Sequence, residues 1–122
     1  MNNIWFFNRY GEAQIIFDKN GRFIDRHGRN LGYLKDNQYL YNYNGKQCGW
    51  MDGYVIRDLY GSTVGFCQYS NDSPSPIFPI PQIPPIPAIP QIPPIPAIPQ
   101  IPYIRPIKTF NWSPLSLINL FN

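Results

Sequence analysis

Side chains able to carry out acid–base or nucleophilic chemistry are sparse in this chain. Its 122 residues include seven acids, one histidine and two cysteines. His27 is the third residue of the turn-like sequence Asp25–Gly28, and three similar sequences carry tyrosine or asparagine at the same place. This equivalence favours a solvated turn residue over a general base, and the acids form no pair suited to acid–base catalysis. We therefore expect no catalytic residue.

The two cysteines, Cys48 and Cys67, also lack the spacing of a metal or redox site. They do not form a Cys-x-x-Cys pair, and they lie three and six residues after the turn glycine that precedes each of them. Zinc sites usually combine four Cys or His ligands at short, regular spacings. The sequence therefore predicts two small buried residues, with no metal site and no cofactor-binding site.

A four-fold repeat organises residues 4–68. Each copy has Asn or Asp at the first position of a turn and Gly at the fourth, which is typical of a type I turn closed by a left-handed residue. The Asn or Asp side chain accepts a hydrogen bond from the backbone two residues on, and glycine adopts the positive φ without steric cost. The four Asx-Gly turns predicted in this way are Asn8 to Gly11, Asp25 to Gly28, Asn42 to Gly45 and Asp58 to Gly61. Turn formation explains all four polar side chains without a bound cation.

Short apolar runs on both sides of each turn predict strands, because they are rich in β-branched and aromatic residues. The runs are Ile4–Phe7 and Ala13–Phe17, Arg22–Ile24 and Leu31–Leu34, Tyr39–Tyr41 and Gln47–Met51, and Tyr54–Ile56 and Thr63–Gln68. The short connections between them require antiparallel neighbours. The expected fold is all-β, with four sequential β-hairpins, eight short antiparallel strands and four-fold pseudosymmetry.

A second glycine follows the first by four residues in three of the copies, which indicates close approach of another backbone or a bend in the strand. The next position is large and apolar in all four: Ile16, Tyr33, Trp50 and Phe66. Four equivalent large side chains are expected to converge on a shared core. The alternative is that Tyr33, Trp50 and Phe66 form a binding surface that stacks on sugars or surrounds a cationic group.

The copies Asp25–Tyr33, Asn42–Trp50 and Asp58–Phe66 resemble the small bacterial domain called the four-fold beta flower. The resemblance covers about residues 4–68 and implies a hairpin rosette, with no catalytic residues to carry over. The sequence Tyr39-Leu40-Tyr41 with Gly49-Trp50 is also similar to choline-binding cell-wall repeats, and Tyr41–Lys46 is similar to YD repeats. The spacing of the aromatic residues departs from both of these families.

Composition changes abruptly at Ser70–Pro76, and a different repeat follows. From Ile77 to Ile107 every third residue is isoleucine, and a nine-residue unit, Gln82–Pro90, recurs as Gln91–Pro99. Proline at this density is incompatible with an α-helix or a sheet ladder. We therefore expect an extended polyproline II arm over residues 71–108, in which thirty residues would reach roughly 90 Å.

Because polyproline II has three residues per turn, the isoleucines of this arm should form one straight apolar ridge. Its central members are Ile83, Ile86, Ile89, Ile92, Ile95, Ile98 and Ile101. A solvated ridge is unfavourable, which favours contact with a partner or another copy of the chain. Alternatively the arm is a spacer, since tandem duplication of the nine-residue unit would copy the spacing without any function.

The C-terminal segment, residues 109–122, combines Ser113-Pro114 with five apolar residues between Leu115 and Phe121. Serine followed by proline is a helix-start signal, so we expect a short helical turn capped by Ser113. A turn this short is not stable alone in water. It must therefore dock on the hairpin domain, on another copy or on a partner.

Charge and hydropathy exclude some classes of protein. All seven acids and eight of the ten basic residues lie within residues 1–72, and there is no basic run, which argues against nucleic-acid binding. No secretory signal is visible, and no run approaches the ~20 apolar residues needed to span a bilayer. These features predict a cytoplasmic protein without a transmembrane segment.

Three parts are thus predicted: a hairpin rosette domain (1–70), the Pro/Ile-rich arm (71–108) and a short apolar C-terminal segment (109–122). The expected function is that of a non-catalytic structural or protein-interaction module, whose proline-rich arm binds a protein partner or associates with itself. Such arms bind at low entropic cost because they are already extended. The alternative is a small-ligand or cell-wall glycan-binding module that uses the aromatic face of the hairpin domain.

Overall fold

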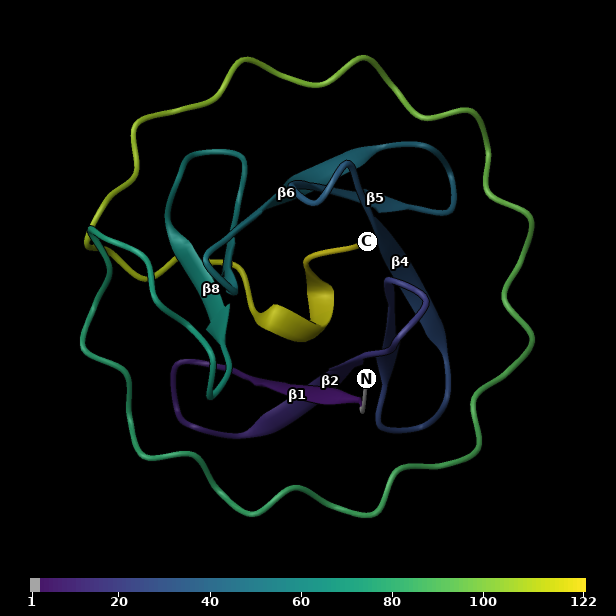
Figure 1. Cartoon of the computed structure of the whole chain (residues 1–122), viewed down its shortest axis with the longest axis horizontal. Coiled ribbons are helices and arrows are strands. Elements are labelled where there is room, and N and C mark those ends of the chain that lie inside the picture. Colours follow the sequence, from purple (N-terminus) through teal and green to yellow (C-terminus); the bar gives the residue numbers. More distant parts are fainter. Residues whose placement is uncertain (1–2) are drawn as a thin grey trace.

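The computed structural model describes residues 3–122. Eight antiparallel strands pair in sequence order, and β8 returns to β1 to close a barrel (Figure 1). They are β1 (Ile4–Phe7), β2 (Ala13–Phe17), β3 (Arg22–Asp25), β4 (Asn30–Lys35), β5 (Tyr39–Asn42), β6 (Gln47–Asp52), β7 (Val55–Arg57) and β8 (Thr63–Phe66). The predicted all-β fold of four hairpins and eight antiparallel strands is confirmed.

The Asx-Gly turns close the four hairpins as the sequence predicts. In each turn the Asn or Asp Oδ1 accepts backbone N–H groups from the residues two and four positions on, at 2.9–3.1 Å. The four turn glycines have φ between +80° and +87°. The Oδ1 atoms of the four Asn and Asp side chains are therefore occupied by hydrogen bonds within the turns, and the turns fix the position of each hairpin tip.

The inner face of the barrel wall carries both large apolar side chains and glycines. The first strand of each hairpin contributes one fully buried residue to the interior: Phe6, Phe23, Leu40 and Ile56. The second glycine of a copy also faces inward, because a Cβ at Gly32 would overlap the ring of Phe121 and one at Gly65 would press on Leu117. The predicted close approach of another backbone is confirmed, because a Cβ at Gly32 would also overlap the carbonyl oxygen of Tyr41 and one at Gly49 that of Arg57.

The predicted convergence of Ile16, Tyr33, Trp50 and Phe66 on a shared core is wrong. None of the four belongs to the interior cluster. Phe66 instead belongs to a second cluster with Phe7, against which Phe78 and Trp112 pack. The physical reason is the alternation of the strand: the glycine occupies the crowded inner side, so the large residue after it lies on the outer side.

The C-terminal segment enters the barrel, where it forms the compact yellow turn at the centre of Figure 1. It passes the seam where β1 and β8 share a single residue pair, and Thr63 exchanges backbone hydrogen bonds with Asn111 and Ser113 at 3.0 and 2.8 Å. The 3₁₀ turn Leu117–Asn119 follows. Leu117, Leu120 and Phe121 are buried in the interior core. We call residues 113–122 the plug.

A short helical turn is thus present, but its predicted start at Ser113 is wrong by three residues. Ser116 precedes the 3₁₀ turn and makes no side-chain cap. The Ser113 hydroxyl accepts the N–H of Leu115 at 3.0 Å, so it forms a local turn before the helix.

Residues 71–108 circle the barrel as a closed belt (Figure 1). The belt donates backbone N–H groups to the carbonyls of all four turn glycines: Gln82 to Gly11, Gln91 to Gly28, Gln100 to Gly45, and Thr109, just past its end, to Gly61. Successive donors are nine residues apart, so one nine-residue unit spans one quarter of the barrel. This segment contains no helix or strand, and polyproline II remains a prediction for it. The prediction of one straight ridge is wrong, because the arm bends around the hairpin domain.

Candidate interaction surface

Isoleucine dominates the outer side of the belt. All eleven isoleucines between Ile77 and Ile107 have 89–96% of their surface exposed. We call them the isoleucine rim; they are Ile77, Ile80, Ile83, Ile86, Ile89, Ile92, Ile95, Ile98, Ile101, Ile104 and Ile107. The arm therefore packs on its own hairpin domain through its other sides, and the ridge itself faces solvent.

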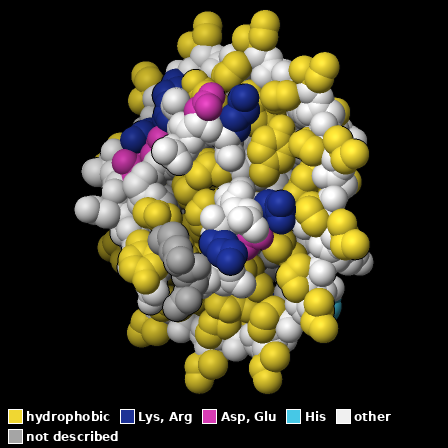
Figure 2. Space-filling model, turned by 45° about the vertical axis from the view of Figure 1, so that its right-hand side comes forward, with side chains coloured by type: hydrophobic (Ala, Val, Ile, Leu, Met, Phe, Trp, Pro, Cys, Tyr) yellow, Lys and Arg dark blue, Asp and Glu magenta, His cyan; other side chains and the backbone are white. Residues whose placement is uncertain are grey.

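The rim carries no charge over most of its length. The sequence has no Asp, Glu, Lys or Arg between Asp72 and Arg105. Hydrophobic side chains accordingly project along the margin of the molecule, while charged groups gather on the face that Figure 2 presents. Apolar surface of this extent and regularity is rare on soluble monomers and is typical of interaction sites.

Beneath the belt, the residue before each Asn or Asp lies on the outer side of the wall and is nevertheless buried. These residues are Phe7, Ile24, Tyr41 and Arg57. The Tyr41 hydroxyl donates to the carbonyl of Gln100 at 2.7 Å, and burial raises the pKa of this phenol. Sequence analysis did not single out this set, although its place immediately before the turn residue repeats as regularly as the turns do.

The sequence-predicted aromatic contacts lie in the same layer. Trp50 is 1% exposed, with the guanidinium of Arg105 5.6 Å from its ring centroid. Phe66 is 3% exposed and stacks on Phe78 of the belt at 4.6 Å. Tyr33 is half-buried and stacks on Tyr41. The belt thus covers the rings of Trp50 and Phe66, while Tyr33 stays half-exposed beside Tyr41.

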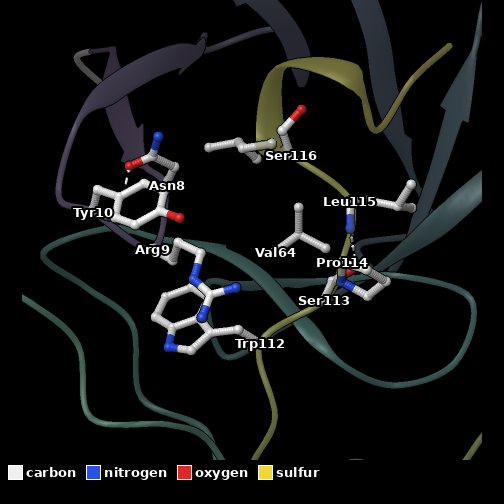
Figure 3. A pocket seen from close by; sticks show the side chains of 10 residues that line it. Asn8, Arg9, Tyr10, Val64, Trp112, Ser113, Pro114, Leu115 and Ser116 are labelled. Atoms are coloured by element: carbon white, nitrogen blue, oxygen red, sulfur yellow. Dashed lines mark hydrogen bonds between the residues drawn. The ribbon is translucent and has the colours of Figure 1, made fainter.

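A pocket of about 150 Å³ opens beside the seam where the plug enters the barrel (Figure 3). Val64 and Leu117 supply apolar lining. The guanidinium of Arg9 lies 6.0 Å from the ring centroid of Trp112 and 5.7 Å from that of Tyr10. Such stacking holds an arginine in place at the surface. It places a cation beside an apolar hollow whose lining also includes the hydroxyl side chains of Ser113 and Ser116.

The residues with reactive side chains are placed as the sequence predicts. His27 is exposed at its turn, and both cysteines are buried free thiols in the interior core. Burial raises the pKa of Cys48 to about 11, which disfavours the reactive thiolate at neutral pH. Within residues 3–122, no cluster of three or more His, Cys, Asp or Glu side chains is arranged to hold a metal ion. No helix in this part of the chain is long and apolar enough to cross a membrane.

Comparisons with known proteins agree with this geometry. No curated protein and no solved structure matches the chain. One family model, described as 4-fold beta flower protein, matches residues 4–121. The match includes the belt and most of the plug as well as the four hairpins, so it extends well beyond the stretch that carried the sequence resemblance. The chain belongs to the 4-fold beta flower family.

Proposed function

We propose that this chain is a non-catalytic protein-interaction module, and that the isoleucine rim is its contact surface for a partner protein. The observation that carries the proposal is the near-complete exposure of all eleven isoleucines on one continuous belt. Solvated isoleucine gives the isolated chain no stability. Contact with a partner would remove this surface from water, which stabilises the complex by about 25 cal/mol for each Å² of apolar surface buried.

The curvature of the belt decides which partner fits. Two convex rims touch only over a short arc, which would bring together few isoleucines from each copy. A stable interface needs about 20–30 residues on each side. We therefore propose a partner with a concave, uncharged apolar groove that follows the rim, in preference to a second copy of the chain.

A photo-crosslinking amino acid at Ile89, introduced into the full chain in cells of its source organism, tests this function. The same group at Lys19, an exposed residue of the turn between β2 and β3, is the control. We expect Ile89 to form an adduct with one partner protein that Lys19 does not capture. An adduct with the chain itself would indicate self-association, and an adduct with lipid would indicate a membrane surface; either result contradicts the proposal.

Purified components complete the test. The variant Ile86→Ser, Ile89→Ser, Ile92→Ser should bind the captured protein at least tenfold more weakly than the original chain. Its thermal stability should stay unchanged, because these side chains are exposed in the isolated chain. Equal binding by the variant and the original chain would contradict a contact through the rim.

A further inference from the structure

The residues of the belt that are neither isoleucine nor proline lie where the belt contacts the hairpin turns. Between positions 79 and 102 the belt consists of isoleucine and proline with five exceptions: Gln82, Ala88, Gln91, Ala97 and Gln100. Each of the five donates its backbone N–H to a carbonyl of an Asx-Gly turn. Proline lacks this donor. The exceptions therefore coincide with the acceptors that the barrel offers.

Two quadrants contain the complete arrangement. At the second hairpin, Ala88 donates to the carbonyl of Arg26 at 3.0 Å and Gln91 donates to that of Gly28 at 2.8 Å. At the third hairpin, Ala97 and Gln100 donate to Tyr43 and Gly45 at 2.9 and 2.8 Å. The paired donors are three residues apart, which places them on one side of a chain with three residues per turn.

The turn glycine contributes shape as well as an acceptor. In the second quadrant the carbonyl of Ile89 lies so close to Gly28 that a Cβ there would overlap it, and Ile98 stands in the same relation to Gly45. The same contact recurs at Gly11 and Gly61, with Ile80 and Ile107. The isoleucine two residues before each donor to a turn glycine thus presents its carbonyl to the barrel and its side chain to solvent.

The other two quadrants lack one donor. Gln82 donates to Gly11 at 2.8 Å and Thr109 to Gly61 at 3.2 Å, but the positions three residues earlier are Pro79 and Pro106. These two quadrants lie at the ends of the belt. The two complete quadrants lie in its middle, where neither the hairpin domain nor the plug adjoins the belt in sequence.

We propose that the second and third Asx-Gly turns are binding sites for proline-rich peptides with the pattern Ala-Ile-Pro-Gln, and that each site recognises the backbone N–H groups of the alanine and the glutamine in this pattern. The belt occupies both sites within the same chain. Its tethering raises its effective concentration to about the millimolar range, so it excludes a separate peptide of the same sequence. A chain whose belt cannot donate at these positions would bind the peptide from solution.

The full chain carrying Ala88→Pro, Gln91→Pro, Ala97→Pro and Gln100→Pro tests this inference. The belt stays joined to the hairpin domain and the plug, but it loses the four donors. In amide NMR spectra we expect the signals of Gly28 and Gly45 to shift, while Gly11 and Gly61 keep their positions. The matched control, Pro85→Ala with Pro94→Ala, adds donors midway between turns and should leave all four glycine signals in place.

A synthetic peptide with the sequence of residues 82–100 then serves as the probe. It should return the Gly28 and Gly45 signals of the four-proline variant to their original positions, with saturation, and should bind the original chain at least tenfold more weakly. A peptide with proline at the four donor positions should have no effect. If the variant does not fold, Ala97→Pro with Gln100→Pro tests the third quadrant alone.

Three results would overturn the inference. The first is that the glycine signals of the proline variant do not move. The second is that the natural peptide does not restore them, and the third is that the all-proline peptide restores them equally well. None of these measurements involves the outward isoleucine side chains, so the outcome is independent of the proposed contact with a partner protein through the rim.

Discussion

At the scale of single residues, the turn glycines have two separate tasks. Each adopts a positive φ that other residues resist, and each leaves room for a belt carbonyl. Gly21 provides a natural comparison, because it has φ +80° in a similar turn, where a Cβ would meet only the carbonyl of Leu34 at an ordinary 3.8 Å. The cost of the backbone strain and the cost of displacing the belt are therefore separable.

We expect Gly21→Ala to lower the free energy of unfolding by about 1–2 kcal/mol, from the left-handed backbone alone. Gly28→Ala should lower it by about 3 kcal/mol, since the displaced belt also loses hydrogen bonds worth about 1 kcal/mol each. Urea denaturation measures both values, and amide exchange at Gln91 reports the belt. Equal losses with slow exchange at Gln91 in both variants would show that the belt does not depend on Gly28.

Asp25 makes a pH dependence predictable at the same scale. Burial opposes ionisation of its carboxylate, but hydrogen bonds from Arg29 and from the N–H of His27 prevail and hold its pKa below the ordinary value of 3.8. A carboxylate with a lowered pKa in the folded state stabilises the fold above its unfolded pKa. This contribution is lost as the pH falls below about 3.8, through the still lower pKa of the folded state.

Asp25→Asn separates that contribution from the turn itself, because Asn8 and Asn42 already make the same turn. At neutral pH the original chain should be more stable than the variant, and the difference should shrink as the pH is lowered from 5 to 2. Urea denaturation across this range checks the prediction. A difference that stays constant would mean that the Asp25 carboxylate does not titrate differently in the folded and unfolded chains.

At the scale of elements, the plug fills space in the barrel interior that the side chains of the strands leave empty. Gly32 and Gly65 leave the interior wall bare, and Phe121 and Leu117 occupy the space that their missing side chains provide. The Asn42 side chain also donates to the carbonyl of Phe121 at 3.1 Å. The plug therefore contributes part of the core that the hairpins share.

Leu117→Ala should lower the free energy of unfolding by about 2–5 kcal/mol, because it leaves a cavity at a fully buried position. Leu115 is two residues earlier and 48% exposed, so Leu115→Ala should cost less than about 0.5 kcal/mol. Thermal or urea unfolding of the two variants measures the contrast. Similar small losses would show that the plug is not part of the cooperative core.

The hairpins could be predicted from the sequence because their signals are local. An Asx side chain, a turn glycine and two short apolar runs specify a hairpin without reference to the rest of the chain. The outward placement of Tyr33, Trp50 and Phe66 could not be predicted in this way, since it depends on a plug more than forty residues further along the chain. The course of the belt depends on a match between a nine-residue unit and a hairpin repeat of 17 or 16 residues. The five residues between positions 79 and 102 that are neither isoleucine nor proline were the signal in the sequence, but their acceptors appear only in the folded structure.

At the scale of the whole molecule, Arg57 joins the two ends of the belt. Its guanidinium is buried and donates to Asp72 at 3.0 Å and to the carbonyl of Pro74, near the start of the belt. It also donates to the carbonyl of Thr109 at 3.3 Å, just past the end. Lys108 reaches Asp72 at 3.0 Å from that end as well. Among the four equivalent positions only this one carries a charge, and it lies where the belt closes on itself.

Arg57→Met should therefore open the belt as well as destabilise the fold. Removal of a buried, multiply hydrogen-bonded cation costs about 3 kcal/mol. The closed molecule should have a radius of gyration of about 14 Å, as expected for a compact chain of this length. Arg105→Met is the matched control, because Arg105 pairs with Asp52 at 2.6 Å on the exposed outer side, where an ion pair contributes less than about 1 kcal/mol. Small-angle scattering should show a larger radius for the Arg57 variant alone. Equal radii would mean that the turns hold the belt without its closure, since the six N–H donors between Gln82 and Thr109 would then suffice.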